Sequence, residues 1–265
     1  MTKKLSEERV FPSKGVNVGV ETLYEDKDHL FLWLGKDESG QEEGVQANQY
    51  LIVDSGQGLL IDPGGFGVFS RVLVNLSHYI DPQSIRDIFL CHQDPDVGGS
   101  LSSWFEMTPA AVHVSELWVR FLLHYGVDDV TRFRGIPDSG GNLTFPSGRK
   151  VDFVPAHFMH SPGNFHLFDH ASGILFTGDI GAAVYPQGQT PTFVENFDEH
   201  VLYMEGFHGR YIPTNQVVQA WLSRVRGLPV RQIAPQHGSI FRGENVGRFL
   251  DWIGTIRCGL ETMKL

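Results

Sequence analysis

The sequence predicts an α/β (α+β) protein built as a four-layer αββα sandwich, with two mixed β-sheets packed face to face and helices on their outer sides. Short apolar or alternating runs typical of strands recur along the chain. In two regions such runs are followed by apolar residues at helical spacing, which indicates helices that cover the sheets. No linker rich in proline or serine divides the 265 residues, so we expect one domain over 1–265.

The expected elements follow from these runs and from the glycine- and proline-containing turns between them. In the first half, strands are expected at 16–24, 30–34, 48–53, 58–61, 85–91 and 111–114, helices at 66–80, from Ser100 and at 116–125, and a loop at 92–99. In the second half, strands are expected within 142–155 around a turn at 146–148, and at 165–168, 174–177 and 230–234. Helices are expected at 198–226, broken near Pro213, and at 245–257.

The charge balance is acidic, with 21 Lys and Arg against 31 Asp and Glu and a formal net charge of −10. Such a chain has no basic surface for nucleic acid or anionic lipid, so neither is expected as a partner. The charged N-terminus lacks the apolar run of a signal peptide, and no stretch is apolar over a membrane-spanning length. Two cysteines, Cys91 and Cys258, are too few for a disulfide framework. We therefore expect a cytoplasmic protein with free thiols.

Potential metal ligands follow four of the predicted strands, each in a loop that contains glycine or proline. The candidates are His92, Asp94 and Asp96 after 85–91, His160 after 151–155, Asp179 after 174–177 and His237 after 230–234. The loops at the ends of strands are where mixed sheets usually place their chemistry. Any one of these residues alone is more often a cap, a turn residue or a satisfied loop histidine. As a set in this order, they predict a two-metal centre.

The spacing His92-x-Asp94-x-Asp96 supports this prediction, because alternate residues of an extended segment project to the same side. Pro95 is expected to hold the segment extended. Imidazole and carboxylate groups crowded together in this way need a compensating cation. His157 is a rival to His160 as a ligand, and His208 is a possible substitute ligand near the site.

Most of the other histidines lie in sequence segments that indicate no role at the metal site. His29 and His200 are expected at surface or turn positions, and His113, in an apolar strand, in the core or beside the ligands.

Several motifs together resemble those of the metallo-β-lactamase superfamily. They are Leu59-Leu-Ile-Asp-Pro-Gly64, the His92 motif, Phe158-Met-His-Ser-Pro-Gly163, Leu175-Phe-Thr-Gly-Asp179 and Ala234-Pro-Gln-His-Gly238, and they span about residues 45–245. Hydrolases of that superfamily usually have a second histidine where this chain has Asp94. An acidic residue there resembles the diiron domain of flavodiiron proteins and the stand-alone oxygen-binding diiron protein (ODP) family.

The resemblance implies roles for the six candidates. His92, Asp94 and His160 would hold the first iron, Asp96 and His237 the second, and Asp179 would bridge them. The carboxylate-rich set favours two Fe ions (Fe2+/Fe3+), with Mn or Zn less favoured. The chain departs from the flavodiiron pattern at Asp94, where that family usually has Glu, and at Val97, where it usually has another histidine. The second metal would thereby lose a ligand and gain an open position, beside which Gly98 and Gly99 would leave room for a small diatomic ligand.

The function that this resemblance implies is that of a non-haem diiron protein that binds dioxygen. It would act as an oxygen or iron sensor in signalling or chemotaxis, or as a slow O2 or NO reductase that needs an external electron donor. No flavodoxin domain and no FMN-binding loop are recognised, so FMN is not expected in this chain. A chemotaxis or redox protein is a possible partner, and a homodimer is possible. The alternative is a dizinc hydrolase of the same fold, in which Asp96 would orient a metal-bound hydroxide.

Overall fold

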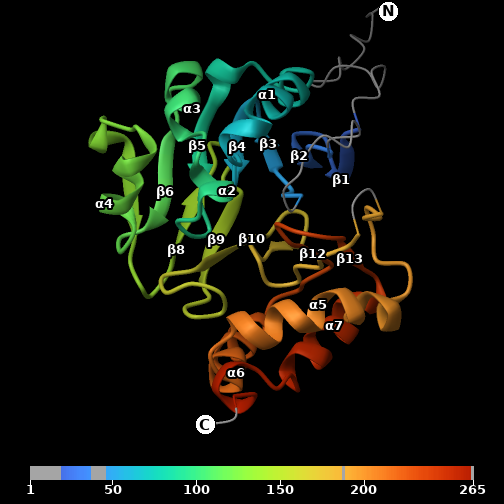
Figure 1. Cartoon of the computed structure of the whole chain (residues 1–265). Coiled ribbons are helices and arrows are strands. Elements are labelled where there is room, and N and C mark those ends of the chain that lie inside the picture. Colours follow the sequence, from blue (N-terminus) through green and yellow to red (C-terminus); the bar gives the residue numbers. More distant parts are fainter. Residues whose placement is uncertain (1–18, 37–45, 187–188, 264–265) are drawn as a thin grey trace, which may run out of the picture.

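Two β-sheets form the centre of the protein, and helices cover the outer face of each sheet (Figure 1). The computed structural model describes residues 19–36, 46–186 and 189–263. Within these residues the first sheet contains seven strands and the second contains six. The expected four-layer αββα arrangement is confirmed.

The first sheet combines an antiparallel meander with a parallel half, in the order β1-β2-β3-β4-β5-β6-β7. Its strands are β1 (Glu21–Glu25), β2 (His29–Trp33), β3 (Tyr50–Asp54), β4 (Gln57–Ile61), β5 (Ile85–Phe89), β6 (Ala111–Ser115) and β7 (Phe133–Ile136). Strands β4 to β7 are parallel, so helical connections join them. These are α1 (Phe69–Ser77), α2 (Pro95–Gly98), α3 (Leu101–Met107) and α4 (Val119–Leu122), with short 3-10 turns at Phe66–Val68, Pro82–Ser84, Leu123–Tyr125 and Val130–Arg132.

The second sheet has the order β13-β12-β11-β10-β9-β8. Its strands are β8 (Gly141–Thr144), β9 (Lys150–Pro155), β10 (Phe165–Asp169), β11 (Ile174–Phe176), β12 (Gln232–Ala234) and β13 (Phe241–Arg242). Only β11 and β12 pair in parallel among the described strands of this sheet, and α5 (Phe197–Tyr211) and α6 (Asn215–Val225) connect them. Helix α7 (Glu244–Gly254) and a 3-10 turn at Gly259–Glu261 follow.

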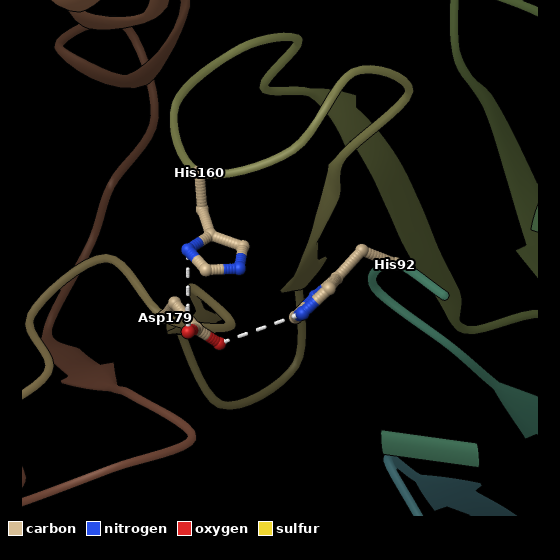
Figure 2. A group of neighbouring side chains, drawn as sticks. All are labelled: His92, His160 and Asp179. Atoms are coloured by element: carbon tan, nitrogen blue, oxygen red, sulfur yellow. Dashed lines mark ion pairs between the residues drawn. The ribbon is translucent and has the colours of Figure 1, made fainter. Parts of the chain in front are cut away.

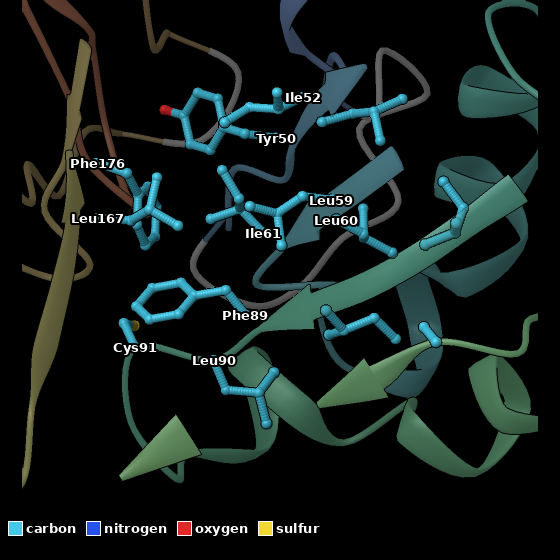
Figure 3. Close-up of a cluster of buried hydrophobic side chains, with 14 of the residues drawn as sticks. Tyr50, Ile52, Leu59, Leu60, Ile61, Phe89, Leu90, Cys91, Leu167 and Phe176 are labelled. Atoms are coloured by element: carbon cyan, nitrogen blue, oxygen red, sulfur yellow. The ribbon is translucent and has the colours of Figure 1, made fainter. Parts of the chain in front are cut away.

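Aromatic side chains from both sheets fill the space between them (Figure 3). Phe89 of β5 stacks on Phe153 of β9 with ring centroids 5.4 Å apart, and it meets Phe176 of β11 edge-on at 6.3 Å. Tyr50 of β3 also meets Phe176 edge-on, with ring centroids 5.5 Å apart. Each such ring removes 150–250 Å² of surface from water, as is typical of a buried aromatic, so these contacts hold the two sheets in a fixed relation.

A second apolar cluster lies between the outer face of the second sheet and helices α5 to α7. It includes Phe168 and Leu175 from the sheet and Met204, Trp221 and Phe249 from the helices. Asn196 caps α5 by accepting hydrogen bonds from the backbone of Asp198 and Glu199, both acidic residues that suit a helix N-terminus. The helix ends before Pro213, and α6 begins at Asn215, so the predicted break near Pro213 is confirmed.

Four details of the predicted element pattern were wrong. Strands β7 and β13 were not predicted, and the segment expected as the loop 92–99 contains the short helix α2. The helix expected at 116–125 is shorter, consisting of α4 and a 3-10 turn. The strand expected at 16–24 is observed as β1, while residues 16–18 of that prediction lie outside the described residues.

Two histidines occupy positions other than those expected. His29 and His200 are buried rather than exposed, because each finds polar partners inside the fold. The ring of His29 lies between Asp54 of the first sheet and Asp169 of the second, with nitrogen–oxygen distances of 2.9 Å to both. His113 is partly buried between the sheets, as expected of a core position, because it pairs with Asp87 at 2.7 Å and its ring lies 5.3 Å from that of Phe153 in the second sheet. In the described part of the chain, no helix has the length and apolar character needed to cross a membrane.

Candidate metal centre

The six predicted ligands converge at one edge of the sandwich, where both sheets present the carboxyl ends of their strands. His92, Asp94 and Asp96 follow β5 of the first sheet. The other three follow strands of the second sheet, namely His160 after β9, Asp179 after β11 and His237 after β12. The two sheets are joined at this edge by a hydrogen bond from the backbone N–H of Phe165 to the carbonyl of Cys91. The pairing of the sheets thus brings ligands from both halves of the chain together.

His92, His160 and Asp179 form the tightest group, and one ligand atom of each lies within 4.8 Å of the others (Figure 2). The His92 Nε2 atom is 3.8 Å from Asp179 Oδ1, and the His160 Nδ1 atom is 3.4 Å from Asp179 Oδ2. Asp94 completes this side, because its Oδ2 atom is 3.3 Å from the Nε2 atoms of both histidines. Two imidazoles and two carboxylates therefore face a common centre.

Asp96 and His237 lie on the other side of Asp179. The His237 Nε2 atom is 3.1 Å from Asp96 Oδ2 and 3.9 Å from Asp179 Oδ1. One oxygen of Asp179 thus lies within 4 Å of nitrogens from both His92 and His237. This central position is the one that a bridging carboxylate would occupy.

The local backbone at Asp94 and Asp96 differs from the prediction. Asp94 is extended, with φ −67° and ψ 153°, but it is followed by the first turn of α2, in which Asp96 lies. Pro95 opens this helix instead of prolonging the strand, as proline often does at a first helical position. The two carboxylates reach the same centre through a strand-to-helix turn, so the predicted alternation of an extended segment was wrong.

Atoms that point into this centre lack partners of their own. Among the described residues, His92 Nε2, His160 Nδ1 and Asp179 Oδ1 are buried atoms without a hydrogen bond. Buried polar atoms are normally satisfied, and clustered exceptions need a reason such as an ion. Nitrogen and oxygen donors that converge in this way fit a transition-metal site. The residues present are therefore compatible with a bound metal.

The charges of the cluster also fit a cation. Burial opposes a charge on His237, but its hydrogen bond with Asp96 and the charge of Asp179 prevail and raise the pKa of His237 to about 9. Burial likewise opposes a charge on His92, and the nearby carboxylates of Asp94 and Asp179 still raise its pKa. The close contacts with His160 and His92 hold the pKa of Asp94 well below its usual range. The metal-free cluster thus retains protons where a cation would replace them.

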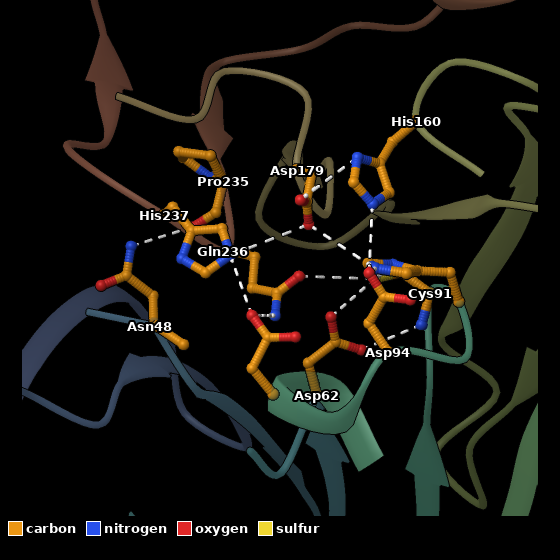
Figure 4. A network of polar contacts seen from close by, with 12 residues as sticks. Asn48, Asp62, Cys91, Asp94, His160, Asp179, Pro235, Gln236 and His237 are labelled. Atoms are coloured by element: carbon orange, nitrogen blue, oxygen red, sulfur yellow. Dashed lines mark hydrogen bonds and ion pairs between the residues drawn. The ribbon is translucent and has the colours of Figure 1, made fainter. Parts of the chain in front are cut away.

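Several surrounding residues orient the ligands, and sequence reasoning did not single them out (Figure 4). His237 donates from Nδ1 to the carbonyl of Gln46 at 2.9 Å, which turns its Nε2 atom toward the centre. Gln236 donates to Asp96 at 3.3 Å. Asn48 donates to the carbonyls of Pro235 and Gly238, and this contact holds the His237 loop against the first sheet. Such contacts fix the ring orientation and tautomer of metal ligands.

A second set of supporting contacts lies behind His92. The Cys91 thiol is 2.9 Å from the His92 Nδ1 atom and donates to Asp62 Oδ2 at 2.7 Å. Burial raises the pKa of the Cys91 thiol well above its usual range, so the sulfur keeps its proton. Burial also raises the pKa of Asp62, to about 7. The motif around Asp62 and the free thiol were both visible in the sequence, but their contact depends on the pairing of β4 with β5.

Helix α5 covers His160 with two aromatic rings. The ring of His160 stacks on Tyr211 at 5.1 Å and on Phe207 at 5.8 Å, and the two aromatic rings stack on each other at 4.4 Å. No sequence signal linked the end of this helix to the site. Gln93 links the loop of Asp94 to the loop of His160, because it donates a hydrogen bond to Asp94 and accepts one from Ser161, both at 2.8 Å.

The two alternative histidines are not available as ligands in this structure. His157 lies outside the cluster, with its Nε2 atom 2.8 Å from the carbonyl of Asp138. His208 is buried nearby, but its Nε2 atom accepts a hydrogen bond from the backbone of Gly181 and its Nδ1 atom donates to the carbonyl of Met204, both at 2.9 Å. His208 therefore supports the loop that carries Asp179, and the expectation that it substitutes as a ligand was wrong.

The residues that follow Asp96 pack inward. Val97 is fully buried in the core and carries no metal-binding atom. A Cβ atom at Gly98 would lie 3.3 Å from Leu90, and at Gly99 it would collide with the carbonyl of Pro95. These glycines permit close packing of α2, so the expectation that they leave room for a ligand was wrong.

A family model described as ODP family beta lactamase matches residues 45–238. The fold also superposes on a solved structure described as a peroxy diiron species of the chemotaxis sensor ODP, with 46% identity, a TM-score of 0.83 and coverage of 92% of this chain and 97% of that chain. An apo-state structure of the chemotaxis sensor ODP from T. denticola matches with 45% identity, a TM-score of 0.81 and the same two coverages.

Among curated proteins, the flavo-diiron protein FprA2 of Clostridium acetobutylicum is 25% identical over 217 residues, which cover 77% of this chain and 52% of that protein. The chain spans between 37% and 54% of the length of the first curated relatives that it matches. The similarity therefore concerns only part of each of these larger proteins.

Proposed function

The chain belongs to the ODP family of beta-lactamase-fold proteins, and from this premise we propose that it is a non-haem diiron protein that binds dioxygen as an oxygen sensor. The observation that carries the proposal is the centre itself, with three histidines and three carboxylates from both sheets around Asp179. The 46% identity to a protein described as a peroxy diiron chemotaxis sensor supports the same function.

In this proposal the six side chains divide into two sets of ligands. His92, Asp94 and His160 hold one iron, Asp96 and His237 hold the other, and Asp179 lies between them. The short distances from Asp179 to histidines of both sets support this division. Three carboxylates in the set favour iron, with manganese or zinc less favoured.

The second iron has fewer protein donors than the first. Val97 supplies none, and both nitrogens of His208 are engaged elsewhere. The second iron would therefore keep a coordination position that dioxygen or nitric oxide could take. A ferrous pair would supply electrons to such a ligand. A reductase would need further electrons from an external donor, whereas a sensor would not.

The wider context of the site is proposed on the same basis. We place the whole chain in one cytoplasmic domain over 1–265 that binds no FMN. Since the solved relatives are described as chemotaxis sensors, a signalling protein is the favoured partner and a redox protein is the alternative. A homodimer is the proposed assembly.

The test begins with protein purified without oxygen and loaded with Fe(II). We expect about two irons per chain and a visible absorption band that develops when oxygen is added. A control aliquot loaded with Zn(II) should show no such band. Protein that retains zinc, shows no oxygen-dependent spectrum and hydrolyses ester or thioester substrates would instead be a dizinc hydrolase, and the proposal would be rejected.

A further inference from the structure

The side chain immediately before His92 is the thiol of Cys91, which the proposed chemistry does not use. It is fully buried, and its Sγ atom lies 2.9 Å from His92 Nδ1 and 2.7 Å from Asp62 Oδ2. Among the described residues, these are the close polar contacts of the sulfur apart from the Gln236 amide oxygen at 3.9 Å. We propose that Cys91 is a positioning residue, through which Asp62 fixes the ring of His92 for metal binding.

The direction of the hydrogen bonds follows from the metal's need for a lone pair on the histidine nitrogen that binds it. The Nε2 atom of His92 faces Asp94 and Asp179, so this nitrogen must offer its lone pair to the metal. The ring proton must then be on Nδ1, and it can be donated to the sulfur of Cys91. The thiol has one proton of its own, which it donates to Asp62. Each link in the chain from Asp62 to His92 therefore carries one proton.

Asp62 is well placed to hold this arrangement. Its Oδ1 atom accepts the backbone N–H of Cys91 at 2.9 Å, so both carboxylate oxygens bind residue 91. Asp62 is itself fixed in a left-handed conformation with φ 45°, and its backbone N–H donates to the carbonyl of Phe89 at 2.9 Å. The carboxylate therefore orients the thiol, and the thiol orients the imidazole.

The sulfur also contacts the turn that carries Asp179. A Cβ atom added at Gly178, where φ is +52°, would lie only 2.9 Å from Cys91 Sγ. The thiol thus fills the space between His92 and the Gly178–Asp179 turn, and a larger side chain would displace one of the two. Serine is smaller and keeps a proton donor and an acceptor, whereas alanine removes both.

This inference rests on the proposed metal-binding role of His92, and the variants Cys91→Ala and Cys91→Ser test it. The measurement is Fe(II) affinity by anaerobic competition with a chelator, together with the melting temperature of each metal-free protein. Loss of a contact behind a metal ligand typically weakens metal binding by about 10–100-fold, and we expect this for C91A. Serine should restore most of the affinity. Cys258→Ala is the matched control, because it removes a fully buried thiol from the other core cluster.

A second measurement starts from the wild type and does not depend on a variant that folds. In the Zn(II)-loaded wild type, 15N NMR should show a proton on His92 Nδ1 that exchanges slowly with water, and in C91A this exchange should accelerate. The inference is overturned if C91A binds iron within about threefold of C258A, or if His92 Nδ1 carries no proton in the wild type. If C91A does not fold, the wild-type NMR result decides. A wild type that binds neither metal would overturn the proposed function as well, whereas normal binding with an indifferent C91A rejects only the role of Cys91.

Discussion

Asp179→Asn tests the centre most specifically, since it replaces one carboxylate oxygen with an amide while leaving the size of the side chain unchanged. The Asp179 oxygens lie 3.4–3.9 Å from nitrogens of His160, His92 and His237. A cation held by these nitrogens would lie no farther than about 4 Å from the carboxylate, where two unit charges attract by roughly 4 kcal/mol at an effective dielectric constant of 20. Since about 1.4 kcal/mol changes an equilibrium constant tenfold, the variant should bind iron roughly a thousandfold more weakly.

The assay is anaerobic Fe(II) titration against a chelator, with iron counted per chain after desalting. The metal-free variant provides a separate readout. Because the charge of Asp179 favours the protonated forms of His237 and His92 in the metal-free protein, a neutral amide should lower the melting temperature at pH 7. Asp152→Asn is the control, because Asp152 pairs with the exposed His170 outside the centre. Iron binding by D179N equal to that of D152N would refute the placement of Asp179 between two metals.

Three further predictions concern charge and packing. Fe(II) affinity should rise as pH increases from 7 to 9, because the metal must displace a proton from His237, whose pKa is raised to about 9. Calorimetry in two buffers should show the released proton, and an Fe(II) affinity that does not change with pH would contradict this. His29→Leu should lower the free energy of unfolding of the metal-free protein by about 3–5 kcal/mol, measured in urea at pH 6. Burial opposes the charge of His29, but Asp169 and Asp54 raise its pKa, so the stability advantage of the wild type should be full below about pH 6.5 and shrink as pH rises through the folded-state pKa. An advantage that grows with pH would contradict this prediction. Tyr211→Ala should weaken iron retention about 2–10-fold by removing a ring worth about 0.5–1.5 kcal/mol from His160, whereas Leu202→Ala on the exposed face of the same helix should not.

The fold was largely predictable because local patterns and tertiary packing agree along most of the chain. The strand before His92 and the helix break at Pro213 depend on apolar spacing and on the limits that proline imposes, and both are visible in a short window of sequence. The strand β13 has two residues and is defined by its pairing with β12, so no local sequence pattern predicts it. The turn from Asp94 into α2 was missed because proline is compatible with both an extended segment and a helix start.

The gathering of the six candidate ligands was predictable from their positions after strands, since strand ends meet at a sheet edge. What supports them was not predictable, because it depends on contacts between distant segments. His208 reaches Gly181 from α5, and Tyr211 reaches His160 from the end of the same helix. The burial of His29 has the same origin, since its partners Asp54 and Asp169 belong to different sheets. A histidine's sequence neighbours do not reveal such partners.

Anomalous diffraction from anaerobically grown, iron-loaded crystals tests most directly whether one chain holds two irons around Asp179. We expect two iron peaks above the iron absorption edge, one beside His92, Asp94 and His160 and the other beside Asp96 and His237, with the Asp179 carboxylate between them. A single peak confined to His92 and His160, or no iron at the Asp96 and His237 side under saturating Fe(II), would contradict the two-metal centre.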